Sequence, residues 1–213
     1  MGDHAGHDAV RRSYDAVAEE YAARLHDELA GKPLDRALLG RLLEEREDGA
    51  AIADLGCGPG HVAAWLAGHG VLTVGIDLSA GMLSAGRRRY PEVEFRAGDL
   101  LALPAGDGEF GAAVALYSII HLDPRDLPRA FGEARRVLRP SGLFLLSFHI
   151  GEEVRHLDEW WGHDVDIDFR FLDPSPVAGL LEEAGFTVTM RRARAPYPHE
   201  ADTRRGYLLA RRT

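Results

Sequence analysis

Cysteine is almost absent from this sequence of 213 residues, and its scarcity excludes two kinds of protein. The single cysteine, Cys57, has no partner for an internal disulfide, and a zinc site built from several cysteines is excluded as well. Lysine is equally scarce, because Lys32 is the only one and every other basic residue is arginine. With abundant alanine and glycine, this bias indicates a bacterial genome of high GC content. One cysteine also fits a cytoplasmic location.

The sequence also lacks a long apolar run and an excess of positive charge. Its longest apolar stretches, such as LFLLSF, are far shorter than the about 20 residues that cross a membrane. The N-terminal stretch MGDHAGHDAVRRSYD contains no apolar signal core. The formal net charge of −9 disfavours nucleic acid or an anionic membrane as the main partner. Ordinary hydrophobic content, 46%, suits one globular domain.

What the sequence does contain is an alternation of apolar runs and helical patterns. Apolar residues recur at helical spacing over residues 8–29, and a helix is predicted after Pro33, so we expect a helical cap over residues 1–48. Five short strands then alternate with helices over residues 50–149, which predicts a parallel sheet covered on both faces. Residues 150–175 break the alternation and are predicted to form a lid over a site. A helix and two antiparallel strands follow.

The stretch DLGCGPGH, residues 54–61, directly follows the first predicted strand and is rich in glycine. In an open parallel sheet, ligands bind at the carboxyl ends of the strands, and a glycine-rich turn lets a ligand approach the backbone. Gly56 and Gly58 fit the dinucleotide pattern G-x-G-x-x-G. His61 replaces its third glycine, and a glycine falls at Gly60 instead. The fingerprint is therefore imperfect for a dinucleotide.

An acidic residue, Asp77, ends the second predicted strand, at the position that binds a ribose diol in nucleotide-binding sheets. A carboxylate accepts hydrogen bonds from two hydroxyls there, and its charge disfavours a 2′-phosphate. Together with the imperfect glycine pattern, this predicts an adenosine ligand without phosphates.

These segments resemble the class I S-adenosylmethionine (SAM)-dependent methyltransferases. IADLGCGPG is similar to the first motif of that family, VGIDLS to its acidic second motif, and AGDLLALPAGDGEFGAAVALYSIIHL to its third and fourth strands. RVLRPSGLFLLS, SYDAVAEEYAARL and LLEEAGF are also typical. The resemblance implies one SAM-dependent methyltransferase domain over residues 1–213, with SAM as cofactor and S-adenosylhomocysteine as product. It implies an α/β, Rossmann-like, doubly wound sheet of seven strands with the last strand antiparallel, N-terminal helices, and a lid insertion after strand five.

The resemblance also implies a set of cofactor contacts, which follow the strands in order. Residues expected along the methionine part of SAM are Asp54, which would reach the amino group, Gly56, Cys57, Gly58 and Gly60. Residues expected at the adenosine are Asp77 for the ribose, Leu78 and Met82 for the adenine ring, and Asp99 and the Leu100 backbone for the adenine nitrogens. Residues expected near the sulfonium are Tyr117, Ser118 and His121, with Tyr14 and Tyr21 on a closing helix.

The methyl acceptor is predicted to be a small molecule, because ALYSIIHL stands where amino-methylating nucleic-acid enzymes carry an NPPY-type motif. A sulfonium methyl is already activated, so the protein mainly has to hold the nucleophile in line with it. His121 and His149 are the candidate catalytic bases for an acceptor that must lose a proton. Acceptor contacts are expected from Tyr14, Tyr117, His149, Trp160, Trp161 and Arg170. A carboxylate acceptor would need no base, and Arg170 or Arg204 would hold it.

Other interpretations stay open at this point. His156, His163 and nearby aspartates suggest a metal site, but no familiar calcium or zinc spacing appears, so no metal is predicted. A nicotinamide-dependent oxidoreductase is the nearest alternative by fold, although the only lysine precedes the glycine turn and leaves no Tyr–Lys pair for that chemistry. A protein that binds SAM without turnover is the non-enzyme alternative. The oligomeric state stays open between monomer and homodimer.

Overall fold

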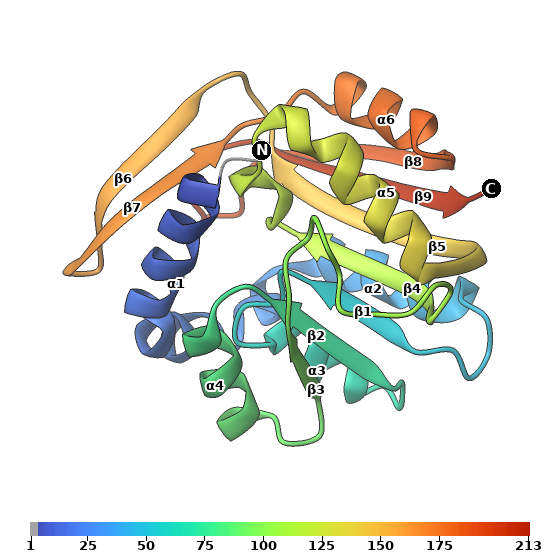
Figure 1. The fold of residues 1–213 in the computed structure, drawn as a ribbon, viewed down its shortest axis with the longest axis horizontal. Helices are drawn as coiled ribbons and strands as arrows, with labels where there is room; N and C mark the ends of the chain where they lie inside the picture. Colours follow the sequence, from blue (N-terminus) through green and yellow to red (C-terminus); the bar gives the residue numbers. More distant parts are fainter. Residues whose placement is uncertain (1–3) are drawn as a thin grey trace.

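The computed structural model describes residues 4–213, which form a seven-stranded sheet with helices on both faces (Figure 1). The strand order is β3-β2-β1-β4-β5-β9-β8. The strands are β1 (Ile52–Leu55), β2 (Thr73–Asp77), β3 (Glu94–Ala97), β4 (Phe110–Leu116), β5 (Leu138–His149), β8 (Phe186–Arg194) and β9 (Arg205–Arg212). All neighbours pair in parallel except β9, which is antiparallel to both β5 and β8. The predicted doubly wound sheet with an antiparallel last strand is confirmed.

Of the five helices that follow the N-terminal helix, four pack into two separate cores, one on each face of the sheet. The five helices are, in chain order, α2 (Pro33–Glu45), α3 (His61–Ala67), α4 (Ala80–Arg89), α5 (Leu127–Val137) and α6 (Pro174–Glu183). α2 and α3 pack on the face that carries Ile52 and Leu145, whereas α5 and α6 pack on the face that carries Ala53 and Leu146. Successive strand residues point to opposite faces, so neighbours in sequence enter different cores.

The N-terminal segment is helical, as expected, but its first helix is shorter at the C-terminal end. α1 (His4–Leu25) ends before residue 29, and the 3-10 helix η1 (Glu28–Gly31) follows. At this turn Leu29 is buried in the core that α2 and α3 share, and Glu28 is hydrogen-bonded to His61 of α3. α1 packs against α4. No helix among residues 4–213 is both long and apolar enough to cross a membrane.

Residues 150–175 contain a two-stranded antiparallel hairpin that the sequence did not predict. β6 (Val154–Trp160) and β7 (His163–Arg170) form a sheet of their own. β6 is mostly exposed and lacks the apolar alternation by which half-buried strands are recognised. β7 does alternate, with Val165, Ile167 and Phe169 between aspartates, and these apolar side chains are buried or half-buried. In Figure 1 the hairpin extends from the main sheet along α1, which β7 contacts. The predicted lid segment is therefore an ordered ribbon beside the N-terminal helix.

Candidate functional site

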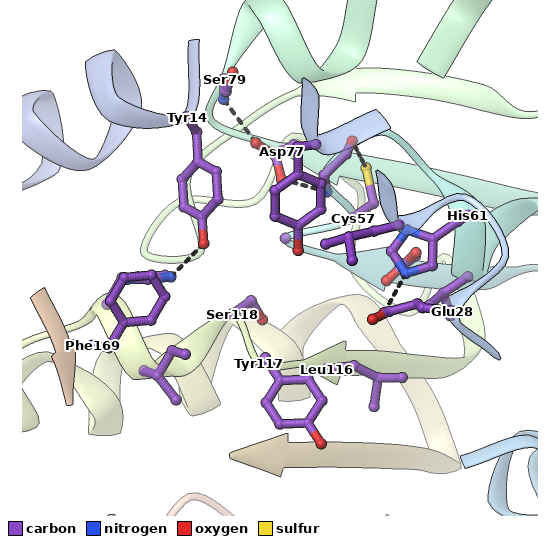
Figure 2. Close-up of a pocket in the computed structure, with 18 of the residues that line it drawn as sticks. Tyr14, Glu28, Cys57, His61, Asp77, Ser79, Leu116, Tyr117, Ser118 and Phe169 are labelled. Carbon is purple, nitrogen blue, oxygen red and sulfur yellow. Dashed lines mark hydrogen bonds and ion pairs between the residues drawn. The ribbon is translucent and has the colours of Figure 1, made fainter. Parts of the chain in front are cut away.

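The carboxyl ends of β1, β2, β4 and β5 open onto one cavity of about 770 Å³, which α1 and the hairpin tip also line. Pockets of roughly 300–1,000 Å³ are typical for small ligands. Figure 2 shows side chains from several of these elements pointing toward one another. The predicted site residues that line the cavity are Tyr14, Tyr21, Asp54, Gly56, Cys57, Gly58, Asp77, Leu78, Asp99, Leu100, Tyr117, Ser118, His121, His149, Trp160 and Trp161.

Two residues expected to contact the cofactor lie outside the cavity, and packing explains both. Gly60 has a φ of +84°, and a Cβ there would stand 2.4 Å from the ring of Phe95. A side chain is therefore excluded by the core and not by a ligand. Met82 is fully buried and packs against Val17 and Ala18, because α1 lies over that side of α4.

The two arginines expected to hold an acceptor carboxylate also lie outside the cavity lining. Arg170 ends β7 and pairs with Asp168 of the same strand at 3.1 Å. Arg204 is exposed just before β9. The next residue, Arg205, is 4% exposed and lines the cavity instead. Adjacent residues leading into a strand point to opposite sides, so a shift of one position decides which arginine faces the site.

The two remaining glycines of the turn have different functions. Gly56 has a φ of +72°, and a Cβ there would stand 2.3 Å from the Cβ of Ser118, so this glycine brings the turn against the end of β4. Gly58 has a φ of +54°, and a Cβ there would meet nothing closer than the Tyr21 ring at 3.9 Å. Only Gly58 therefore leaves open space beside the backbone for a ligand.

Asp77 lies at the cavity edge of the same turn, as expected for a residue that binds a ribose (Figure 2). Its carboxylate accepts hydrogen bonds from the backbone N–H of Gly58 at 2.7 Å and of Ser79 at 2.8 Å. Burial raises the pKa of Asp77, while these backbone hydrogen bonds act in the opposite direction. Two carboxylate oxygens carry about four acceptor positions, so capacity for two hydroxyl groups remains.

Asp54 offers a buried acceptor that the protein itself leaves unpaired. It is 2% exposed, and its Oδ2 has no hydrogen-bond partner among residues 4–213. Burial raises the pKa of Asp54 to about 7. An unpaired buried carboxylate is costly, and a ligand cation beside it offsets that cost. The ammonium of the methionine part of SAM is such a cation, so Asp54 fits the cofactor that the motifs imply.

We expect the affinity for S-adenosylhomocysteine to rise with pH as Asp54 ionises around pH 7. Below that pH the carboxyl is neutral, attracts the ammonium less, and the affinity falls by up to about tenfold per pH unit. Calorimetric titrations between pH 5.5 and 8.5 measure this slope. Asp54→Asn removes the slope, whereas Asp107→Asn, which changes an exposed carboxylate outside the cavity lining, keeps it. A wild-type affinity that does not change with pH would contradict the assignment.

His121 lines the cavity beside Tyr14, and the two side chains are hydrogen-bonded to each other. Its Nδ1 lies 2.9 Å from the backbone oxygen of Asp168, and its Nε2 lies 2.7 Å from the Tyr14 hydroxyl. A carbonyl only accepts, so Nδ1 carries the proton, and Nε2 accepts the hydrogen bond that Tyr14 donates. Burial lowers the pKa of His121 to about 4, which keeps the imidazole neutral at physiological pH. Both ring nitrogens are therefore occupied, and Tyr14 is the group exposed to a ligand.

His149, the other candidate base, lies at the end of β5. Its Nδ1 is 2.8 Å from the Thr203 hydroxyl, and its ring stands between those of Tyr117 and Phe171, with centroids 5.1 and 5.2 Å away. The pKa of His149 is lowered to about 4, first by burial and then by the nearby Arg205 and other cations. His149 is therefore also neutral at physiological pH.

Five aromatic side chains from α1 and the hairpin form a continuous wall of the cavity: Tyr14, Tyr21, Trp160, Trp161 and Phe169. Their ring centroids lie between 5.0 and 6.0 Å apart, mostly in edge-to-face arrangements. Such pairs contribute about 0.5–1.5 kcal/mol each beyond the area they bury. The wall therefore holds α1 and the hairpin together across the cavity.

Sequence reasoning missed several polar residues that line the cavity, namely His7, Glu28, Lys32, Glu200 and Arg205. His7 lies 3.0 Å from Asp99, which also accepts from the Leu101 backbone. None of these residues belongs to a family motif, and only the uniqueness of Lys32 could have drawn attention. Among the described residues, no group of three or more His, Cys, Asp or Glu is arranged to hold a metal ion.

Comparison with known proteins gives consistent results. Residues 52–142 match the protein family described as a methyltransferase domain. The chain is 33% identical over 140 residues to a demethylmenaquinone methyltransferase of Beutenbergia cavernae, covering 65% of this chain and 57% of that protein. It is 31% identical over 214 residues to a ubiquinone/menaquinone biosynthesis C-methyltransferase of Methylobacterium nodulans, covering 86% of this chain and 82% of that protein.

Solved structures share the fold across the whole chain. A 1,6-didemethyltoxoflavin-N1-methyltransferase of Burkholderia thailandensis, with bound S-adenosylhomocysteine, has a TM-score of 0.78 at 21% identity and covers 100% of this chain and 91% of that chain. A magnesium protoporphyrin IX methyltransferase of Synechocystis, with bound SAM, has a TM-score of 0.75 at 16% identity. The match covers 98% of this chain and 97% of that chain.

The sheet, the glycine turn and the two carboxylates at its edge together define a Rossmann-like adenosine-binding protein of the methyltransferase class. With the sequence relatives beside them, the chain belongs to the SAM-dependent methyltransferases. SAM is the methyl donor of this family.

Proposed function

We propose that this protein transfers the methyl group of SAM to a small-molecule acceptor by in-line displacement. The observation that carries this proposal is that one cavity is lined both by Asp54, Gly58 and Asp77 and by Tyr117 and His149. SAM supplies a methyl group on a positively charged sulfur, which takes the electron pair of the breaking bond. The protein's part is to hold both ligands in one water-poor cavity, and alignment of this kind contributes about 7–11 kcal/mol.

The cofactor half of the cavity is proposed from the turn residues. Asp54 would bind the methionine ammonium, Gly58 would leave room for its carbon chain, and Asp77 would accept from the ribose hydroxyls. Asp99 and the Leu100 backbone would bind the adenine. Asp99 already accepts from His7, so an adenine amino group would share that carboxylate with α1.

The proton of an N–H or O–H acceptor would leave through the pair formed by Tyr14 and His121. The acceptor would donate to the Tyr14 oxygen while Tyr14 passes its own proton to Nε2 of His121. The backbone oxygen of Asp168 then holds the second ring N–H of the resulting imidazolium. His149 is the alternative base, and no described residue other than Thr203 hydrogen-bonds its ring.

The acceptor itself is proposed to contain a planar ring. The aromatic wall described above offers flat faces and edges for such a ring. The sequence relatives are named for ubiquinone and menaquinone biosynthesis, which supports an acceptor of this shape. Their bacterial sources support the bacterial origin expected from composition, and the cytoplasmic location stays a prediction.

Cofactor binding and turnover are tested separately. We expect calorimetry to give a micromolar Kd for SAM, and we expect no binding of NAD, since Gly60 is not positioned for a pyrophosphate. Formation of S-adenosylhomocysteine from SAM is then followed by mass spectrometry with a panel of phenols, quinols, aromatic amines and organic acids. Binding of SAM with no product across that panel would favour a SAM-binding protein without turnover, and tighter binding of NAD would favour an oxidoreductase.

A further inference from the structure

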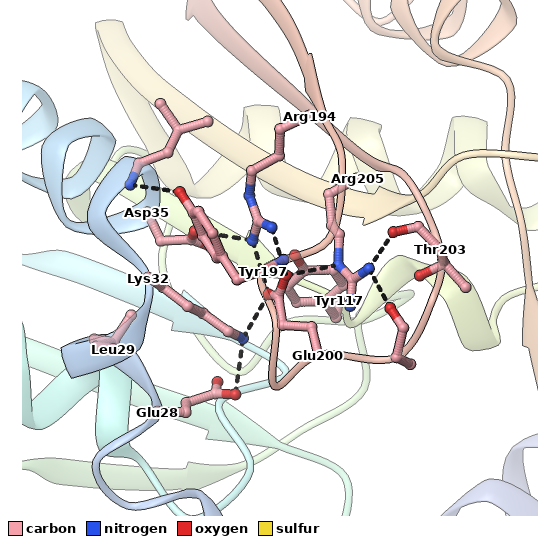
Figure 3. A network of polar contacts seen from close by, with 12 residues as sticks. Glu28, Leu29, Lys32, Asp35, Tyr117, Arg194, Tyr197, Glu200, Thr203 and Arg205 are labelled. Atoms are coloured by element: carbon pink, nitrogen blue, oxygen red, sulfur yellow. Dashed lines mark hydrogen bonds and ion pairs between the residues drawn. The ribbon is translucent and has the colours of Figure 1, made fainter.

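Two buried cations, Lys32 and Arg205, lie at the end of the cavity near Tyr117 and His149 (Figure 3). Lys32 is 8% exposed and Arg205 is 4% exposed. The Nζ of Lys32 lies 4.0 Å from Oε1 of Glu200, and the Nε of Arg205 lies 3.5 Å from its Oε2. The start of α2 and the start of β9 thus bring two positive charges to the two sides of one carboxylate.

The carboxylates around these cations already hold protein donors on both of their oxygens. They are Glu28, Glu200 and Asp35, and each also takes part in an ion pair. Glu28 accepts from His61 and Lys32. Glu200 accepts from Arg194 and from the backbone N–H of Tyr197. Asp35 accepts from Tyr207 and Arg194. The acceptors in this network are therefore largely used.

The N–H donors of Lys32 and Arg205, by contrast with these carboxylate oxygens, are only partly used. Lys32 makes one hydrogen bond, to Glu28 at 2.8 Å, because Glu200 is too distant for a second. The hydrogen bonds that residues 4–213 give Arg205 all leave from Nη1, toward the backbone oxygens of Ala201 and Thr203. The Nε of Arg205 is buried and has no hydrogen-bond acceptor among residues 4–213, because Oε2 of Glu200 at 3.5 Å makes an ion pair with it but no hydrogen bond. Buried N–H groups normally have acceptors, so this end of the cavity has an excess of donors.

We propose that Lys32 and Arg205 bind an oxyanion of the methyl acceptor, and that the acceptor is therefore a small organic acid. This inference rests on the proposed function. A carboxylate brings two oxygens with several acceptor positions, and it matches the planar donor fork of arginine. Tyr117 lies beside Lys32, whose Nζ is 5.2 Å from its ring centre, and beside His149, whose tilted ring has its centroid 5.1 Å away. The carboxylate at this end directs the rest of the molecule past Tyr117 toward the glycine turn.

The carboxylate of the cofactor's methionine part has the same chemistry, so the test has to separate the two ligands. The probes are matched acids and amides: 4-hydroxybenzoate, anthranilate and indole-3-acetate, each against its carboxamide. Their binding is measured by calorimetry on protein saturated with S-adenosylhomocysteine, so no turnover is needed. We expect at least one acid to bind tenfold or more tightly than its amide.

Arg205→Met and Lys32→Met are expected to reduce that preference to less than threefold, while the affinity for S-adenosylhomocysteine changes by less than threefold. Arg205→Lys keeps the charge and should retain an intermediate preference. Arg204→Met, at the adjacent exposed arginine, is the matched control and should behave as wild type. Thermal unfolding confirms that each variant is folded.

Three results would overturn the proposal. Acids that bind no better than their amides, or not at all, remove its basis. If both Met variants still prefer the acid over its amide, other residues bind the carboxylate. If the Met variants lose affinity for S-adenosylhomocysteine together with the acid preference, Lys32 and Arg205 bind the carboxylate of the cofactor. Wild-type protein that fails to bind SAM, by contrast, contradicts the proposed function itself.

Discussion

Gly58→Val should raise the Kd for S-adenosylhomocysteine by about a hundredfold or more, which corresponds to about 2.7 kcal/mol. The reason is geometric: a side chain there would project into the cavity, where the nearest protein atom is 3.9 Å from the Cβ position. The space it would fill is the space proposed for the methionine part of the cofactor. Calorimetry with S-adenosylhomocysteine measures the loss.

A valine at this position also strains the backbone, because φ is +54°. Gly70→Val is the matched control, since Gly70 has a φ of +78° and open space around it but lies outside the cavity lining. Both variants pay a similar cost of about 1–2 kcal/mol in stability, visible as a lower Tm. Only Gly58→Val should lose the ligand. Normal affinity in Gly58→Val would remove the glycine turn from the cofactor site.

Tyr14→Phe should lower kcat by about a hundredfold for an acceptor that loses a proton, because general base catalysis contributes roughly 10²–10⁴-fold. His121 cannot replace the hydroxyl directly, since its Nδ1 is held by the Asp168 backbone and its Nε2 lies 2.7 Å from the missing oxygen. The affinity for S-adenosylhomocysteine should change by less than threefold. The measurement is product formation with an acceptor found in the panel above.

Double variants separate a proton relay from a purely structural contact. If Tyr14 and His121 act as one unit, Tyr14→Phe, His121→Ala and the double variant lose similar amounts of kcat, whereas His149→Ala adds its loss independently. Nitrogen NMR of the His121 ring should show a neutral imidazole with the proton on Nδ1 at pH 5.5. In Tyr14→Phe the pKa of His121 should rise, because Nε2 loses a donor that favours the neutral form. Full activity of Tyr14→Phe beside an inactive His149→Ala would make His149 the base.

The succession of strands and helices along the chain and the cofactor motifs could be predicted because each depends on local sequence. β1 is a continuous apolar run before a glycine turn, and Asp77 ends the next such run. The hairpin was not predicted, because β6 has no apolar period and the alternation of Val165, Ile167 and Phe169 in β7 is short. Contacts with α1, far away in the sequence, hold β7 in place. Ser13 illustrates this, since its hydroxyl hydrogen-bonds both the N–H and the carbonyl of Asp166 in β7.

The sequence did not predict the end of the cavity that Lys32 and Arg205 line, because its residues are also far apart in the chain. Lys32 and Glu28 come from the N-terminal segment, and Arg205 and Glu200 from the last connection, so no sequence window contains them together. Gly60 shows the opposite limit, and its contact with the cofactor stays a prediction. It belongs to a motif, but its neighbour in space is Phe95 of β3, and only the fold brings that ring under the turn.

The attachment of α1 also bears on how quickly the enzyme can exchange its ligands. The helix lines the cofactor half of the cavity and is held there by side-chain pairs, His7 with Asp99 and Tyr14 with His121. These bonds can open without disturbing any strand of the main sheet. Movement of α1 therefore offers a route for release of the spent cofactor that leaves the main sheet intact, and the side-chain contacts of this helix set how readily that route opens.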